Sequence, residues 1–139
     1  HVLPELIKKA RVLPIGGLLE VASVDHRRAF CFIDDAVKML RHLVSKTNAV
    51  NGTFNLGNQD QEVSIGEVAK MVLRIIGRAD LKIVALPPTP GSPSRRCPDM
   101  KRTIDFTGFC PAVNLEEGVR RTYKWYVDHV FSDGGVSAI

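Results

Sequence analysis

The sequence predicts an α/β fold made of short strands and about five helices. In several segments, apolar residues recur at three- and four-residue spacing, which is typical of amphipathic helices. Short apolar runs between these segments indicate strands. The 139 residues include 45% apolar side chains and contain no repeat and no linker between domains. We therefore expect a single region over 1–131 and a frayed tail over 132–139.

The first two elements are a helix and a strand. Apolar residues at helical spacing run from Val2 to Arg11, and Pro4 suits the first turn of a helix. Proline and glycine residues over 14–17 then end this helix. The apolar segment from Leu18 to Ser23 predicts the first strand.

The stretch from Arg28 to Asp35 joins an arginine to an apolar run and two carboxylates. The run Phe30 to Ile33 is too short for a helix, so it predicts a strand buried on both faces. Asp34 or Asp35 would cap the helix that follows, which we expect to continue to about residue 45. At the mouth of such a strand, an arginine can offer a bidentate guanidinium to a phosphate. The alternative is a surface arginine that binds nothing.

The middle of the chain predicts a strand, a helix and another strand. Turn residues over 48–52 precede Thr53 to Leu56, a second short apolar run. Ser64 and Glu67 have the spacing of a capping box, and apolar residues at helical spacing follow them as far as Ile76. The segment from Leu81 to Leu86 then reads as a strand.

A proline-rich segment over 87–94 separates this strand from two arginines. Proline removes backbone donors, so we expect a mobile loop without regular structure. Arg95 and Arg96 follow directly. Two adjacent arginines at the exit of such a loop suit an anion that the loop closes over.

Two helices are predicted after the arginines. Asp99 is placed to cap a short helix that Gly108 ends. Asn114 introduces the last helix, with Glu116 and Glu117 in the first turn, where the helix dipole favours negative charge.

Composition excludes several classes of function. The net charge is +4 and the nineteen basic residues are spread along the chain, which favours a local anionic ligand over nucleic acid. The cysteines Cys31, Cys97 and Cys110 form an odd, scattered set that supports neither disulfides nor a zinc site, and the histidines lack metal-ligand spacing. We therefore predict no metal and a reducing compartment, the cytoplasm.

The ends and the hydropathy of the chain give two further expectations. No apolar run is long enough to span a bilayer, and the N-terminus lacks the layout of a signal peptide. The chain begins at His1 without a methionine, so we expect it to be a piece of something longer.

The order of several short motifs resembles the C-terminal part of the extended short-chain dehydrogenases that act on nucleotide sugars. This family includes enzymes of the UDP-glucuronate decarboxylase, UDP-glucose 4-epimerase and dTDP-glucose 4,6-dehydratase types. Each motif alone is weak, but six in the family's order carry the resemblance. The motifs are Arg28-x-Phe30-x-Phe32-Ile33-Asp34-Asp35, Phe54-Asn55-Leu56-Gly57, Ser64-Ile65-Gly66-Glu67, Arg96-x-x-Asp99, Gly108-Phe109-x-Pro111 and Leu115-Glu116-Glu117-Gly118.

The resemblance implies that residues 1–131 bind the substrate. Arg28 would contact the diphosphate of a UDP-, dTDP- or CDP-sugar, and either Arg95 or Arg96 would be the second phosphate-binding arginine. Asp99 would lie near the ribose or cap the next helix, and the capping role comes first because an aspartate before a helix usually has it.

The resemblance also implies that the catalytic half of such an enzyme is absent. The sequence has no glycine-rich dinucleotide turn. The family's tyrosine has a lysine four residues later, whereas Val127 follows Tyr123 and Val130 follows Tyr126 at that spacing. NAD would be bound by a missing N-terminal Rossmann domain, on which residues 35–57 are candidates to pack. Exposed apolar surface, and self-association to cover it, would follow.

Two functions stay open at the level of sequence. In the first, the chain is the substrate-binding part of an NAD-dependent epimerase, dehydratase or decarboxylase and is inert by itself. In the second, it is a free-standing, non-catalytic binding or protein-interaction module of the same fold. Nucleic-acid binding is not supported, because no platform of aromatic and basic residues is present.

Overall fold

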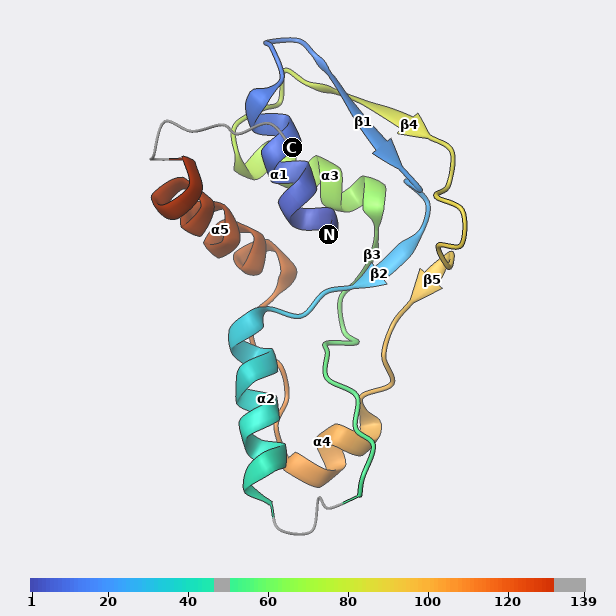
Figure 1. Cartoon of the computed structure of the whole chain (residues 1–139), viewed down its shortest axis with the longest axis vertical. Coiled ribbons are helices and arrows are strands. Elements are labelled where there is room, and N and C mark those ends of the chain that lie inside the picture. The colour runs from blue at the N-terminus through green and yellow to red at the C-terminus, as the bar shows by residue number, and fades with distance from the viewer. Residues whose placement is uncertain (47–50, 132–139) are drawn as a thin grey trace.

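The computed structural model describes residues 1–46 and 51–131, which form an α/β fold of five α-helices and short strands (Figure 1). This confirms the predicted fold class. The elements in order are α1 (Val2–Val12), β1 (Leu18–Ala22), β2 (Arg27–Ala29), α2 (Ile33–Ser45), β3 (Glu62–Ser64), α3 (Ile65–Ile75), β4 (Lys82–Leu86), β5 (Arg95–Arg96), α4 (Lys101–Thr107), α5 (Leu115–Tyr126) and the π-helix η2 (Val127–Phe131). The predicted tail at 132–139 and residues 48–50 of the predicted turn lie outside the described residues.

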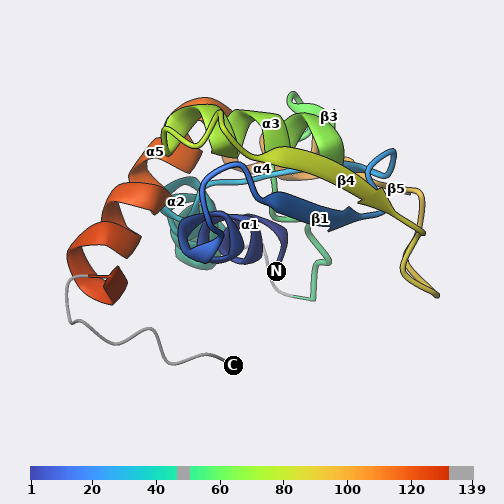
Figure 2. The ribbon, with the colours of Figure 1, turned by 90° about the horizontal axis from the view of Figure 1, so that it is seen from above.

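The core lies among α1, α3, the start of α5 and the inner face of β1. Strand β1 pairs in parallel with β4, and Figure 2 shows this sheet on one side of α1 and α3, with α5 on the other. The second sheet has the order β3-β2-β5. Helices α2 and α4 lie at the far end of the molecule from the core (Figure 1). The buried core residues are Leu6, Ile7, Ala10, Leu19, Val21, Ile65, Val68, Ala69, Val72, Leu73, Leu81, Leu115 and Val119.

The predicted capping box begins α3. The Ser64 hydroxyl accepts from the Glu67 amide at 3.1 Å, and the Glu67 carboxylate accepts from the Ser64 amide at 2.7 Å. These two bonds satisfy amides that have no partner within the helix. Helix α3 therefore starts where the sequence predicts, and its apolar face enters the core.

Arg78 closes the turn after α1. Its guanidinium donates to the carbonyls of Ala10, Leu13 and Pro14 at 2.5 to 3.0 Å and pairs with Asp80 at 2.9 Å. The Asp80 carboxylate also accepts from the Gly16 amide at 3.0 Å. The last carbonyls of a helix attract a cation, so this arginine joins α1 to the start of β4.

The predicted strand over Phe30 to Ile33 is wrong. The strand is β2, which covers the three residues directly before Phe30, and α2 already begins at Ile33 after an extended Phe32. β2 forms where β3 and β5 offer backbone partners, whereas Phe30 to Phe32 has none among the described strands. Phe32 instead packs on Gly118, where an added Cβ would lie 3.4 Å from the ring.

Neither aspartate caps α2, which corrects the second expectation for this stretch. Asp34 and Asp35 lie in the first turn, and the N-cap residue Phe32 makes no side-chain cap. Asp35 is fully buried, and its Oδ2 accepts from the amides of Ala112 and Val113 at 3.0 and 2.8 Å. It therefore ties α2 to the segment before α5.

The predicted strand over Thr53 to Leu56 is also not formed. No described strand pairs with this segment. Its Asn55 carbonyl accepts from the Thr103 hydroxyl at 2.7 Å, and the Asn55 amide side chain donates to the Asp99 carbonyl at 2.8 Å. A strand needs a neighbour for its backbone groups, and within the described residues this segment has only side-chain and loop partners.

The segment over 87–94 has no helix or strand, as its prolines predict. The two-residue strand β5 after it was not predicted. No helix within 1–46 or 51–131 has the length and apolar character that crossing a membrane requires.

Candidate substrate-binding site

The register of β2 and β5 decides how the arginines are arranged. These strands are parallel, with Arg28 opposite Arg96 and Arg27 opposite Arg95. Successive side chains of a strand point to opposite faces of a sheet. Arg28 and Arg96 therefore share one face, and Arg27 and Arg95 share the other.

On the second face, Glu62 of β3 binds both arginines. Arg95 donates to the two carboxylate oxygens of Glu62 at 2.8 and 2.9 Å, and Arg27 lies 3.4 Å from the nearer oxygen. The bond from Arg95, followed by the charges of both arginines, lowers the pKa of Glu62 below its usual value. The charge of Arg95 is thus compensated within the protein.

Arg28 has only neutral partners. Its guanidinium donates to the Ser92 hydroxyl at 2.9 Å, the Pro93 carbonyl at 2.8 Å and the Arg27 carbonyl at 2.7 Å. No carboxylate pairs with this half-buried side chain in the described part of the chain, so its positive charge is uncompensated. The proline-rich loop therefore contacts the arginine that the sequence proposed as a ligand anchor.

The Arg96 side chain is exposed and forms no hydrogen bond or ion pair with residues 1–46 or 51–131. Its position opposite Arg28 puts two uncompensated guanidinium groups on neighbouring strands. Such a pair can donate several charge-assisted hydrogen bonds to one multivalent anion.

A cavity of about 310 Å³ opens beside Arg28. Its size lies at the lower end of the range for small-molecule sites. Helix α1, the end of β1 and the loop after β4 form its walls. The lining residues are His1, Val2, Glu5, Leu6, Lys9, Glu20, Val21, Ala22, Ser23, Arg28, Ile65, Thr89 and Ser92.

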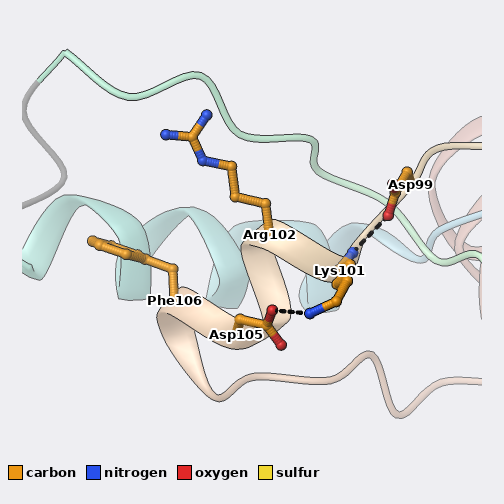
Figure 3. A pocket seen from close by; sticks show the side chains of 5 residues that line it. All are labelled: Asp99, Lys101, Arg102, Asp105 and Phe106. Atoms are coloured by element: carbon orange, nitrogen blue, oxygen red, sulfur yellow. Dashed lines mark hydrogen bonds and ion pairs between the residues drawn. The ribbon is translucent and has the colours of Figure 1, made fainter.

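Asp99 does not line this cavity. One of its carboxylate oxygens accepts a hydrogen bond from the Lys101 amide, in the first turn of α4, at 2.9 Å. The N-cap residue of α4 is Met100, so Asp99 lies one position before the cap. It lines a different hollow of about 540 Å³ at α4, shown in Figure 3, where Lys101 pairs with Asp105. In this hollow the Lys101 ammonium group is paired with Asp105, whereas Arg28 has no carboxylate partner among the described residues, so the hollow suits a diphosphate less well than the Arg28 cavity.

Relatives of known identity match the chain over most of its length. It is 31% identical over 135 residues to the "Probable GDP-L-fucose synthase 1" of Oryza sativa subsp. japonica, covering 95% of this chain and 40% of that protein. It is 33% identical over 104 residues to the "UDP-glucuronic acid decarboxylase 1" of Xenopus tropicalis, covering 75% of this chain and 24% of that protein. The chain is homologous to the NAD-dependent nucleotide-sugar epimerases and dehydratases of the extended short-chain dehydrogenase family.

Solved structures of this type share the fold. A UDP-glucose 4-epimerase from Thermotoga maritima, solved with UDP-glucose, aligns over 92% of this chain and 40% of its own, with a TM-score of 0.79 and 22% identity. A UDP-glucuronic acid 4-epimerase from Bacillus cereus, in complex with UDP-glucuronic acid and NAD, gives a TM-score of 0.80 at 21% identity. No protein-family model matches the chain.

The chain spans only part of these extended short-chain dehydrogenases. It covers 40% of the rice relative and 24% of the Xenopus relative. The T. maritima epimerase is likewise matched over 40% of its chain.

The start of α3 does not fit the dinucleotide NAD, which the B. cereus epimerase of this family binds. A dinucleotide site needs free amides at the start of a helix that follows a strand. The start of α3 follows β3, but its amides are taken: Ile65 donates to the His26 carbonyl at 3.0 Å and Gly66 to the Val24 carbonyl at 2.9 Å. The capping box takes the next amide, so no cradle for a pyrophosphate remains there.

The described residues also contain no cluster of three or more histidine, cysteine or acidic side chains that could hold a metal ion. Sequence reasoning missed Ser92, which holds Arg28, and Glu62, which engages Arg95. Both contacts join residues more than 30 positions apart, and no local pattern signals them.

Proposed function

We propose that this chain is the C-terminal, substrate-binding part of an NAD-dependent nucleotide-sugar epimerase, dehydratase or decarboxylase. The observation that carries the proposal is the position of Arg28, which lines a cavity, opposite Arg96 on the neighbouring strand. Homology to the nucleotide-sugar enzymes supports it. The chain itself supplies substrate binding and no catalytic residue.

In this proposal, Arg28 and Arg96 hold the diphosphate of the nucleotide sugar. The second phosphate contact is assigned to Arg96 because Glu62 already binds Arg95 in a bidentate pair. Asp99 shapes the segment after Arg96 by accepting the Lys101 amide. It is assigned this structural role in place of a contact to the ribose.

A missing Rossmann portion would bind NAD and carry out the chemistry. Because the diphosphate is held, the sugar would face that portion. A binding region that fixes the position of the reacting carbon in this way increases the rate of the reaction. Residues 35–57 would pack on it. Two features support this: α2 exposes several apolar side chains, and the segment 53–56 has no strand partner among the described residues.

The base of the nucleotide is not decided by homology. Some relatives are GDP-L-fucose synthases and others are UDP-glucuronic acid decarboxylases. A UDP-, dTDP- or CDP-sugar fits the proposal as stated, and so does a GDP-sugar, because the arginines contact only phosphate.

The experiment is a calorimetric titration of the chain with inorganic pyrophosphate and with UDP. Arg28→Ala and Arg96→Ala should each weaken binding roughly tenfold to a hundredfold, the range expected for charge-assisted hydrogen bonds. Arg95→Ala is the matched control, since it removes the same charge from the neighbouring residue on the other face. It should retain most of the affinity.

Three results would contradict the proposal. Equal losses in all three variants would mean that only overall charge matters. Unchanged binding in Arg28→Ala would mean that the anion binds somewhere other than the cavity. Absence of pyrophosphate and UDP binding by the wild-type chain would favour the protein-interaction module, because Arg28, Arg96 and the cavity all lie within the described residues.

A further inference from the structure

The proline-rich loop carries a serine whose hydroxyl lies against Arg28. The Ser92 hydroxyl accepts a hydrogen bond from the Arg28 guanidinium at 2.9 Å, and Nδ1 of His26 lies 3.4 Å from the same oxygen. Ser92 also lines the cavity beside Arg28. A group attached to this oxygen would therefore lie next to a guanidinium and an imidazole, at the wall of the cavity.

The backbone around Ser92 forms an exposed turn. The Ser92 amide donates to the Thr89 carbonyl at 3.0 Å, with a proline and a glycine between them, and the glycine, Gly91, has a φ of 75°. Pro93 follows, and a residue before proline favours an extended backbone. The loop has no helix or strand, so it can enter the active site of a modifying enzyme without the loss of either.

The residues after Ser92 form a known type of acceptor sequence. Ser92 is followed by Pro93, Ser94 and Arg95. Serine, proline, any residue and a basic residue is the pattern that proline-directed protein kinases favour. Thr89 of the same loop is also followed by proline, but Ser92 stands where the pattern has a basic residue. The sequence therefore favours Ser92 over Thr89 as an acceptor.

We propose that Ser92 is a phosphorylation site and that its phosphate closes the anion site by binding Arg28. In the modification, the Ser92 oxygen forms a bond to the γ-phosphorus of ATP. The bond from that phosphorus to the bridging oxygen breaks, ADP leaves, and the hydroxyl proton is released. The closure rests on the proposed function, because it takes Arg28 as the diphosphate contact. The contact between the phosphate and Arg28 does not depend on that function.

Phosphorylation would replace a neutral partner of Arg28 by a charged one. The groups that now bond to Arg28 are a hydroxyl and two carbonyls, and none of them compensates its charge. A phosphoserine adds a charge of about −1.5 to −2 at pH 7 and three acceptor oxygens. Hydrogen bonds between a guanidinium and a phosphate are charge-assisted and stronger than those to neutral acceptors. Phosphorylated Ser92 therefore occupies Arg28 and repels a second anion.

The first experiment asks whether the folded chain accepts phosphate at Ser92. The full chain is incubated with ATP and a cyclin-dependent protein kinase, and mass spectrometry locates the phosphate. Modification should occur at Ser92, and Pro93→Ala should abolish it. Modification confined to Thr89, or no modification, would overturn the assignment of Ser92.

The second experiment measures what the phosphate does, with phosphoserine encoded genetically at position 92 of the full chain. The affinity for inorganic pyrophosphate should fall roughly tenfold to a hundredfold, the range expected when charge-assisted hydrogen bonds are lost. Phosphoserine at position 94 is the matched control. It adds the same charge to the same loop, but the Ser94 hydroxyl is not a partner of Arg28 in the described structure, so most of the affinity should remain.

A ³¹P NMR titration tests the contact with Arg28 directly. The second pKa of a phosphoserine is ordinarily about 6. At position 92 this pKa should lie lower, because the neighbouring guanidinium favours the doubly charged form, and Arg28→Ala should restore it. A pKa that Arg28→Ala leaves unchanged would overturn the contact.

The outcomes separate this inference from the proposed function. Pyrophosphate binding that is equally tight with and without phosphate at Ser92 would overturn the closure and leave the diphosphate site standing. Absence of pyrophosphate binding by the unmodified chain would contradict the diphosphate site and its closure together. The ³¹P titration would then still decide whether the phosphate binds Arg28.

Discussion

Asp35 shows how a single charged residue can hold two distant segments together. Its side chain is fully buried at the start of α2, and one carboxylate oxygen accepts from the amides of Ala112 and Val113. The other oxygen has no hydrogen-bond partner among the described residues. Burial of a carboxylate is costly, so the two amide bonds must offset much of that cost.

Two substitutions of Asp35 separate the contribution of these hydrogen bonds to the free energy of unfolding from the contribution of the charge. Asp35→Ala leaves both amides without their acceptor and should lower the free energy of unfolding by about 2 kcal/mol. Asp35→Asn keeps an oxygen acceptor and removes a buried charge, so its effect should be clearly smaller. Urea denaturation followed by circular dichroism measures both. Equal losses in the two variants would mean that the charge itself is required.

At the scale of elements, one ion-pair cluster joins α3 to α5. Glu116, in the first turn of α5, lies 2.8 Å from Arg74 of α3 and 2.7 Å from Arg120 of its own helix. Hydrogen bonds from Arg74 and then Arg120 lower the pKa of Glu116 from 4.5 to about 2. All three side chains are exposed, so the contribution to stability is modest.

Because of this cluster, we expect the free energy of unfolding to depend on pH. A carboxylate whose pKa is lower in the folded state stabilises the protein above its unfolded pKa, and that contribution is lost as the pH falls. The wild-type chain should therefore exceed Glu116→Gln in stability at neutral pH, and the difference should shrink from pH 4.5 to about pH 2. Thermal denaturation across this range measures it.

The control for this prediction is Glu117→Gln. Glu117 pairs with Arg121 four residues later within α5, so the substitution leaves the contact between α3 and α5 in place. A stability difference for Glu116→Gln that stayed constant down to pH 2 would contradict the linkage. It would point to a packing effect of the substitution.

At the scale of the whole molecule, α2 has two apolar faces and only one is covered. Met39 and Leu43 are buried, on the side toward α4. A second stripe at helical spacing is exposed, with exposed fractions of 63% at Ile33, 48% at Val37, 49% at Leu40 and 77% at Val44. An uncovered stripe of this kind is typical of a surface that contacts another protein part.

Because this stripe is exposed, substitutions in it should weaken association of the chain without changing its stability. The double change Leu40→Glu and Val44→Glu should alter the free energy of unfolding by no more than about 0.5 kcal/mol, because both side chains are exposed. It should reduce self-association of the chain in sedimentation velocity and abolish pairing with a separately supplied Rossmann portion. Lys38→Glu, which changes the net charge by the same amount on the same helix, should do neither.

A large loss of stability in the double variant would contradict this assignment, since it would mean that the stripe is already covered within the chain. Unchanged association would mean that another surface makes the contact.

Helices were predicted well from sequence and strands less well. The first turn of α3 is encoded by Ser64 and Glu67, which lie three residues apart at the same helix end. The predicted strands over 30–33 and 53–56 were wrong, and β3 and β5 were missed, because strand pairing depends on residues far away in the sequence. For the site, the sequence named the arginines but could not choose between Arg95 and Arg96, a choice that depends on Glu62.

What the sequence by itself determined is local: the capping box that begins α3, the irregular proline-rich loop, and the presence of arginines suited to an anion. The tertiary structure alone decided which arginines share a face, which carboxylate neutralises Arg95, and where Ser92 and Arg28 meet a common cavity. The physical reason is range. Caps and periodicity act over one or two helical turns, whereas strand register and charge compensation join residues that only the folded chain brings together.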